Sequence, residues 1–226
     1  MAIVATPTEV LGVLNDVEAK NAPRTLYLMG DRALLDAGPR VSIVGARKAS
    51  AAGLCRAATY ARRVVEAGGV VVSGLAEGID TAAHEAAIDA GGRTIAVLGT
   101  SLDGVYPAAN RRLQEKIGRD HLLVTQFGPG MPIGRKNFPM RNRTMALLSH
   151  ATLIVEAGEA SGSLHQGWEA LRLGRLLVLD EEIANDRSLK WPAEMIRYGA
   201  QVLGVETTAS FLEELPIGTA VDDFPF

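Results

Sequence analysis

Cysteine, aromatic residues and long apolar runs are all scarce in this sequence of 226 residues. Its one cysteine, Cys55, excludes an internal disulfide, and the chain does not open on the pattern of a secretory signal, so we expect a cytoplasmic protein. No stretch approaches the roughly 20 uninterrupted apolar residues of a membrane-spanning helix, and we expect no membrane association. Aromatic residues make up 5% of the chain while glycine occurs 24 times, which predicts an aliphatic core with many tight turns.

The balance of charge is slightly acidic and uneven. The formal net charge of -3 excludes a uniformly basic coat for nucleic acid. The segment 206–226 holds five acidic residues and no lysine or arginine, so residues 1–205 carry a net charge of +2. Cations gather at 47–48 and at 135–143. A local basic site is therefore compatible with the acidic total.

Short β-branched runs alternate along the chain with alanine-rich stretches, which is typical of a parallel sheet covered by crossover helices. The apolar runs expected to form buried strands are 41–45, 70–74, 94–99, 122–125, 152–156 and 176–179. The stretches expected to form helices are 51–67, 79–91, 107–118, 140–149, 163–173 and 192–199. The sequence thus predicts the α/β class, with a Rossmann-like, mostly parallel sheet and helices on both of its faces.

Three parts of the chain differ in composition. Residues 41–205 form the expected Rossmann-like core, and residues 206–226 form an acidic C-terminal segment. Residues 1–40 form a short N-terminal extension with an expected helix at 7–19 and an extended run at 25–29. The extension has too few apolar residues for a core of its own, so we expect it to pack on the edge of the sheet.

The first strand-to-helix junction, 45–53, has features of a phosphate site, because ligands of open α/β sheets bind beyond the carboxyl ends of the strands. Gly45 permits a tight turn, Arg47 and Lys48 add positive charge, and Ser50 is the expected helix N-cap. The stretch matches neither GxGxxG nor GxxxxGK[ST], which argues against the dinucleotide and nucleoside triphosphatase motifs. A phosphate site and an ordinary connection are equally compatible with it.

The next two junctions are also rich in small residues. Ser73, Gly74 and Gly78 follow a buried strand, where glycines permit a ligand to approach the backbone. Asp80 in the same junction is expected to be a structural cap, and His84 a packing residue, since no nucleophile or second metal ligand lies near it in the sequence. The turn formers Asp103 and Asn110 mark the junction after that.

The fourth junction holds four cations in nine residues: Arg135, Lys136, Arg141 and Arg143, around Phe138. Cations neutralise phosphates and an aromatic face accepts a base, so the pattern favours a nucleic-acid strand. A solvated basic loop with Phe138 in the core is the alternative. Gly162 and Ser163 open a further helix after a glycine-serine turn, which is a second natural phosphate cradle.

Together the junctions resemble the DprA/Smf family of DNA-processing proteins. The matching stretches run from about Thr25 to about Val202: LYLMGD, VSIVGARKAS, VVSGLAEGIDTAAHEAAIDAGGRTIAVLGTSLDGVYPAAN, FPMRNR and VEAGEASGSL. The resemblance implies a Rossmann-like domain that binds single-stranded DNA in a basic pocket, with no enzymatic turnover, metal or cofactor. It also implies a homodimer that loads the RecA recombinase onto DNA during natural transformation and recombination.

The junctions and the resemblance together give a set of candidate DNA- and phosphate-binding residues and no catalytic residue. They are Gly45, Arg47, Lys48, Ser50, Ser73, Gly74, Gly78, Arg135, Lys136, Phe138, Arg141, Asn142, Arg143, Gly162 and Ser163. The sequence departs from the family at Ala46, where a hydroxyl residue is usual, at Ser101, where glycine is usual, and at His165-Gln166, which replaces a smaller pair. These departures leave the choice between single-stranded DNA and a free nucleotide open.

Two other functions remain as alternatives. The first is a sensor of a free nucleotide, since the same junctions suit a mononucleotide. The second, less favoured, is a nucleotide phosphoribohydrolase in which Glu169 assists glycosidic cleavage, although SGSLHQGWE lacks the PGG that precedes such a glutamate. Many family members carry a helical domain before the Rossmann part and a winged-helix-like domain after it, and at 226 residues we expect a stand-alone Rossmann module.

Overall fold

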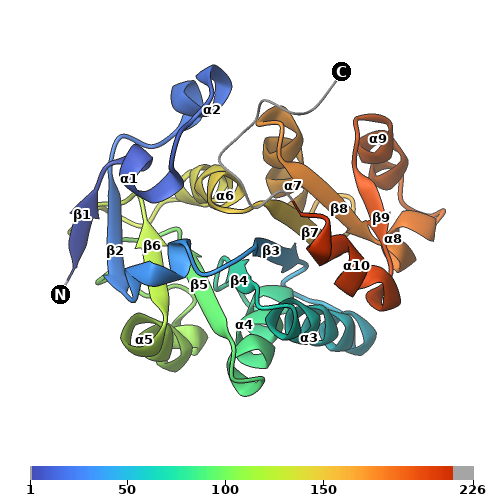
Figure 1. Cartoon of the computed structure of the whole chain (residues 1–226), viewed down its shortest axis with the longest axis horizontal. Coiled ribbons are helices and arrows are strands. Elements are labelled where there is room, and N and C mark those ends of the chain that lie inside the picture. The colour runs from blue at the N-terminus through green and yellow to red at the C-terminus, as the bar shows by residue number, and fades with distance from the viewer. Residues whose placement is uncertain (1, 216–226) are drawn as a thin grey trace.

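A nine-stranded sheet runs through the protein in the order β1-β2-β6-β5-β4-β3-β7-β8-β9 (Figure 1). The computed structural model describes residues 2–215. Its strands are β1 (Ile3–Ala5), β2 (Leu26–Gly30), β3 (Arg40–Gly45), β4 (Val70–Ser73), β5 (Arg93–Leu98), β6 (Leu122–Thr125), β7 (Ala151–Glu156), β8 (Leu176–Asp180) and β9 (Gln201–Leu203). The seven strands from β3 to β9 are parallel, while β2 pairs antiparallel with β6 and with β1. This arrangement confirms the predicted Rossmann-like, mostly parallel α/β fold.

Helices cover both faces of the sheet, because its central strands are apolar on both sides. In β3, for example, Val41 and Ile43 pack under α3 and α4, while Val44 joins the cluster that holds α6. One face carries α3 (Ala51–Glu66), α4 (Ile79–Asp89), α5 (Arg111–Asp120) and α10 (Thr208–Glu213) (Figure 1). The other carries α6 (Asn137–Leu148) and α7 (Ser163–Arg172), with α1 (Pro7–Leu11) and α2 (Asp16–Asn21) beyond them (Figure 1).

The remaining elements are short. They are α8 (Glu181–Asn185), α9 (Trp191–Arg197) and the 3-10 helices η1 (Arg32–Leu35), η2 (Ala108–Asn110) and η3 (Val205–Thr207). The helix expected at 107–118 begins at Arg111 and follows η2, and the helix expected at 140–149 begins three residues earlier, at Asn137. The six expected strands are all present, with ends shifted by at most one residue.

The N-terminal extension adds β1 and β2 to the edge of the sheet beside β6. The single helix expected at 7–19 is wrong: it is two helices, because Gly12 has a positive φ of 77° and ends the first, and Asn15 caps the second. Glu18 of α2 is buried and forms an ion pair with Arg175, which joins the extension to the residue before β8.

The acidic C-terminal segment is partly built into the fold. Its first two residues belong to η3, and the next residues form α10, which packs on α3; Leu212 of α10 and the following Leu215 are buried. The expected boundary after residue 205 therefore falls inside η3. The acidic residues Asp222 and Asp223 lie outside the described residues.

The order of the strands reverses direction between β3 and β7. From β3 the chain moves through β4, β5 and β6 toward one edge, and from β7 it moves through β8 and β9 toward the other. The loops after β3 and β7 therefore diverge, and a crevice forms at the carboxyl ends of these two strands, where open α/β sheets bind their ligands.

Candidate nucleic-acid interface

A pocket of about 600 Å³ lies in this crevice. Four segments contribute most of its lining: the end of β3 and its turn, the start of α4, the first half of α6, and the turn after β7 with the start of α7. From the predicted set it brings together Gly45, Arg47, Lys48, Phe138, Arg141, Asn142, Gly162 and Ser163.

The turn after β3 offers positive charge and unpaired backbone donors to the pocket. The side chains of Arg47 and Lys48 are exposed, and neither forms an ion pair with any described residue. Within residues 2–215, the backbone N–H groups of Arg47, Lys48 and Ala49 have no protein acceptor. Such a turn at the start of a helix suits an anion, because the N–H groups and the helix dipole both favour negative charge.

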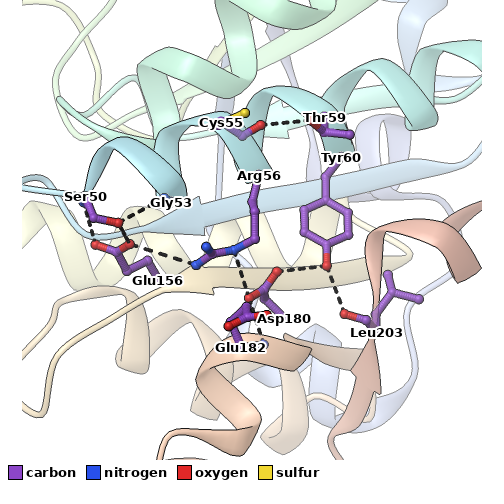
Figure 2. Close-up of polar contacts among 10 residues, drawn as sticks. All are labelled: Ser50, Gly53, Cys55, Arg56, Thr59, Tyr60, Glu156, Asp180, Glu182 and Leu203. Atoms are coloured by element: carbon purple, nitrogen blue, oxygen red, sulfur yellow. Dashed lines mark hydrogen bonds and ion pairs between the residues drawn. The ribbon is translucent and has the colours of Figure 1, made fainter.

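Ser50 and Glu156 fix the shape of this turn (Figure 2). Ser50 is the N-cap of α3, and its hydroxyl oxygen accepts a hydrogen bond from Gly53 N at 3.0 Å. The Glu156 carboxylate accepts from the N–H of Ser50 at 2.8 Å and from its hydroxyl at 2.6 Å. The backbone carbonyl of Glu156 also accepts from Ala46 N at 2.6 Å. Ser50 thus positions the turn and does not line the pocket, and its contact with a ligand stays a prediction.

A network of polar side chains extends from Glu156 toward the edge of the sheet (Figure 2). Arg56 lies between Glu156, at 4.0 Å, and the buried Asp180, at 3.1 Å. Asp180 accepts a hydrogen bond from the Tyr60 hydroxyl at 2.9 Å. Burial raises the pKa of Asp180 while Tyr60 and Arg56 work against that rise, and burial beside Asp180 raises the pKa of Tyr60. This network ties α3 to the end of β8 and supports the helix that begins at the phosphate-site turn.

The turn after β4 is built around Asp80. This carboxylate accepts from Gly74 N at 3.1 Å and from Ala76 N at 3.4 Å, the two groups that flank Leu75, which has a positive φ of 58°. Gly78 rather than Asp80 is the N-cap of α4. Asp80 is therefore structural, as expected, but holds the preceding turn instead of capping the helix. Burial raises the pKa of Asp80, against the opposing charge of Arg141.

The predicted phosphate contacts of Ser73, Gly74 and Gly78 are not available in the main pocket. Ser73 is fully buried, and its hydroxyl donates to Ile43 O at 2.7 Å. Gly74 faces Arg141, whose Nη1 would lie 1.9 Å from an added Cβ, and a Cβ on Gly78 would lie 2.3 Å from Ala46 O. These glycines permit close packing of neighbouring segments.

The four cations of the fourth junction separate into three environments. Arg141 is buried and donates from Nη1 to the carbonyls of Gly74 and Val97, the latter at 2.9 Å. Burial lowers its pKa, against the attraction of Asp80. Arg141 thus lines the wall of the pocket as a structural residue that joins α6 to the ends of β4 and β5.

Arg143, Arg135 and Lys136 lie away from the pocket lining. Arg143 donates to Glu169 from Nε at 2.9 Å and from Nη2 at 3.2 Å. Arg135 and Lys136 are exposed in the loop that leads into α6. The sequence shows four cations in a row, but only these two stand free of protein partners among the described residues.

Phe138 lies at the mouth of the pocket, beneath Arg47. The guanidinium carbon of Arg47 is 5.7 Å from the centroid of its ring. Phe138 packs on Gly99 at the end of β5, where a Cβ would lie 2.8 Å from the ring. The ring is only partly buried, so the predicted aromatic face is present beside a cation.

The opposite wall consists of the turn after β7. Asn142 donates from Nδ2 to Gly162 O at 3.3 Å, which joins α6 to this turn. Nothing lies within 4 Å of a Cβ built on Gly162, so the wall is open there. Ser161, His165 and Gln166 also line the pocket. His165 and Gln166 appeared in the sequence only as a departure from the family, so composition alone gave no reason to place them in the site.

Two other polar residues that the sequence singled out, His84 and Asn110, form hydrogen bonds inside the fold. His84 is buried and its Nδ1 lies 2.7 Å from the Thr94 hydroxyl, which agrees with the expected packing role. Asn110 is buried and donates to Leu75 O at 2.9 Å.

Within residues 2–215, no cluster of three or more histidine, cysteine, aspartate or glutamate side chains is arranged to hold a metal ion. No helix in the same range has the length and apolarity needed to span a bilayer.

The chain is similar in sequence to proteins that process DNA. The family model for DNA recombination-mediator protein A matches residues 12–216. DNA processing protein DprA of Streptococcus pneumoniae is 45% identical over 158 residues, which make up 70% of this chain and 55% of that protein. DprA of Bacillus subtilis is 34% identical over 194 residues, 86% of this chain and 65% of that protein. The chain thus spans less than two thirds of the length of these two relatives.

Solved structures show the same relationship. DprA of Streptococcus pneumoniae has a TM-score of 0.78 at 35% identity, over 95% of this chain and 74% of that chain. DprA of Helicobacter pylori, which binds single-stranded DNA, also has a TM-score of 0.78, at 27% identity and over 95% of both chains. The molybdenum cofactor binding protein of Rippkaea orientalis, with a TM-score of 0.57 at 18% identity, shares the fold, covering 78% of this chain and 96% of its own. A family match across residues 12–216, together with a sheet and crevice of this form, shows that the chain belongs to the DNA recombination-mediator protein A family, DprA/Smf.

Proposed function

We propose that this chain binds single-stranded DNA in the crevice between β3 and β7 and acts without chemical turnover. The observation that carries the proposal is the turn at 45–50. It presents two exposed cations and three backbone N–H groups, none of which has a protein partner among residues 2–215, to a pocket of about 600 Å³. The Helicobacter pylori relative, which binds single-stranded DNA, supports it.

Each part of the pocket has a separate task in this proposal. A phosphate lies on the N–H groups of the turn, and Arg47 and Lys48 neutralise its charge. The base of the same nucleotide stacks on the exposed face of Phe138. A duplex hides its base faces inside the stack, so a site that offers one aromatic face and one phosphate turn prefers a single strand.

A salt series tests this proposal. Binding of labelled single-stranded oligonucleotide, duplex DNA and mononucleotides is measured by fluorescence anisotropy. We expect the single strand to bind most tightly, with an affinity that falls by about 0.7 log unit per log unit of salt for each neutralised phosphate. Absence of single-strand binding at low salt, or equal affinity for duplex, contradicts the proposal.

A free-nucleotide sensor is the second candidate, because the pocket volume of about 600 Å³ is in the range of small-molecule sites. Thermal unfolding in the presence of a nucleotide panel separates the two functions. A nucleotide present at one hundred times its dissociation constant stabilises the folded state by about 2.7 kcal/mol. If no nucleotide raises the melting temperature while oligonucleotides do, the sensor is excluded.

The alternative of a phosphoribohydrolase depends on Glu169, the glutamate that would assist glycosidic cleavage. Glu169 does not line the pocket, and it forms ion pairs with Arg143 and Arg172. Burial acts to raise the pKa of Glu169, but the two arginines outweigh it and lower the pKa. A carboxylate held ionised is a poor proton donor for glycosidic cleavage. Release of free base from a nucleoside monophosphate, lost in Glu169→Gln, would contradict this part of the proposal.

The cellular role is a further part of the proposal. We infer a homodimer in the cytoplasm that assists RecA loading during DNA uptake and recombination, on the strength of the family alone. Light scattering on the purified chain measures the mass of the assembly. RecA filament formation on single-stranded DNA, with and without the chain, measures the loading. A monomer that leaves filament formation unchanged would contradict this role while leaving DNA binding intact.

A further inference from the structure

A second, smaller hollow adjoins the main pocket at Phe138. It has a volume of about 50 Å³ and lies between the turns that follow β3, β4 and β5. Arg47, Phe138 and Arg141 line both hollows, so the Phe138 ring stands between them. Tyr106 and Pro107 form the far side of the smaller hollow.

Tyr106 presents its ring to solvent beside Phe138. The two ring centroids are 5.1 Å apart, with an angle of 52° between the ring planes. The Tyr106 side chain belongs to a residue that is 44% exposed, and among the described residues its hydroxyl has no hydrogen-bond partner. Packing of the core therefore does not account for a tyrosine at this position. Arg47 and Tyr106 instead both lie against the Phe138 ring, so one cation and two rings form a cluster.

Two contacts of Phe138 and its neighbour hold the ring of this cluster in place. Gly99 leaves room for the ring at the end of β5. The preceding Asn137 donates from Nδ2 to Gly99 O at 3.2 Å. A ring fixed in this way costs little conformational entropy when a base stacks beside it.

We propose that Tyr106, beside Phe138, forms a second base-binding subsite, which takes the nucleotide next to the one whose phosphate lies on the 45–50 turn. This inference rests on the proposed function. A hollow of about 50 Å³ cannot enclose a base, so the base lies on the exposed Tyr106 ring. Every base has a π-face, so the subsite is tolerant of sequence.

The charges around the smaller hollow orient the bound DNA strand. Glu77 and Arg47 are exposed and both line the smaller hollow, and Arg47 also lines the main pocket. An acidic side chain repels a phosphate, and the phosphate is attracted toward Arg47 and Lys48. The second nucleotide is therefore bound through its base at Tyr106, with its phosphate directed away from Glu77.

The substitutions Tyr106→Ala and Tyr106→Phe test the subsite, with an oligo-dT and an abasic oligonucleotide of the same length as ligands. Base stacking on an aromatic side chain contributes about 1–3 kcal/mol, so Tyr106→Ala should weaken oligo-dT binding by about 5- to 150-fold. Tyr106→Phe keeps the ring and should bind within about twofold of the wild type. The abasic oligonucleotide has the same phosphates and no bases, so all three proteins should bind it equally.

A double-mutant cycle with Phe138→Ala distinguishes a base stacked directly on Tyr106 from an indirect effect in which Tyr106 only supports the Phe138 ring. Tyr106→Ala should still weaken oligo-dT binding in the Phe138→Ala background. If it has no further effect there, or if it weakens abasic and normal oligonucleotides equally, Tyr106 is not a base-binding residue. Failure of the wild type to bind any oligonucleotide would instead overturn the proposed function, so the two failures are distinguishable.

Discussion

Ser50 and Glu156 are joined by two hydrogen bonds across 106 residues of sequence, from the Ser50 N–H at 2.8 Å and from its hydroxyl at 2.6 Å. The contact fastens the turn after β3 to the end of β7, the two strands between which the order of the sheet reverses. The same serine caps α3. One side chain thus sets both the start of a helix and the shape of the turn that faces the pocket.

Ser50→Ala should lower the free energy of unfolding by about 1–2 kcal/mol, because the helix loses its cap and Glu156 loses a donor. Urea unfolding measures the loss. Ser188→Ala is a matched control, since Ser188 is exposed and lies outside the pocket lining, and it should change the free energy of unfolding by less than about 0.5 kcal/mol. Equal effects of the two substitutions would show that the contact with Glu156 does not stabilise the protein.

Arg47→Ala and Lys48→Ala should weaken single-strand binding and reduce its salt dependence. Each removes one exposed cation from the pocket mouth, so the slope of log affinity against log salt should become shallower by about 0.7 per residue. Arg62→Ala removes an exposed cation of α3 that lies outside the pocket lining and should leave the slope unchanged. A similar loss in all three variants would point to a general charge effect and not to a site at the turn.

Arg141→Ala should lower the free energy of unfolding, in addition to any effect on DNA binding. The substitution leaves the buried carbonyls of Gly74 and Val97 without this donor and removes a positive charge that opposes the rise in the pKa of Asp80. A buried polar group left unsatisfied costs about 1–3 kcal/mol. Urea unfolding of Arg141→Ala beside Arg47→Ala measures the contrast, since the exposed Arg47 should contribute less than about 0.5 kcal/mol. A stable Arg141→Ala with specifically reduced DNA binding would assign Arg141 to the ligand.

The contrast between Arg141 and Arg47 shows what the sequence can predict. Periodicity and apolar runs predicted the six core strands, because strands buried on both faces have to be apolar along their length. The turn at Gly45 was also predictable from glycine followed by cations. The sequence shows how many cations a stretch contains, however, but not which of them form ion pairs or hydrogen bonds in the folded protein. Arg143 meets Glu169 only because α6 and α7 pack side by side.

Short edge elements escaped prediction for a related reason. β9 has three residues, and α8 has five, so neither is long enough for a periodic pattern to appear. The position of β9 beside β8 depends on the sheet that is already formed. In the same way, the pocket residue His165 is defined by the turn after β7 and not by a motif of its own.

His150 should make the folded state lose stability as the pH falls. Its Nδ1 accepts a hydrogen bond from Arg40 N at 2.9 Å, and burial together with Arg40 and Arg175 lowers its pKa to about 4, from an ordinary value of 6.5. Between these two values the unfolded chain binds a proton that the folded chain does not. The stabilisation is therefore complete above pH 6.5 and is lost as the pH falls from 6.5 to about 4.

Urea unfolding at a series of pH values across that range measures the effect. One such histidine contributes at most about 1.4 kcal/mol per pH unit, and screening by water at this half-buried site reduces the figure. The buried His84, whose pKa is lowered to about 3, acts in the same direction, so the wild type should show a slope from both. His150→Gln removes one titrating group, and its free energy of unfolding should fall less steeply with pH than that of the wild type. If His150→Gln retains the wild-type slope, His150 is not the group that couples protonation to unfolding.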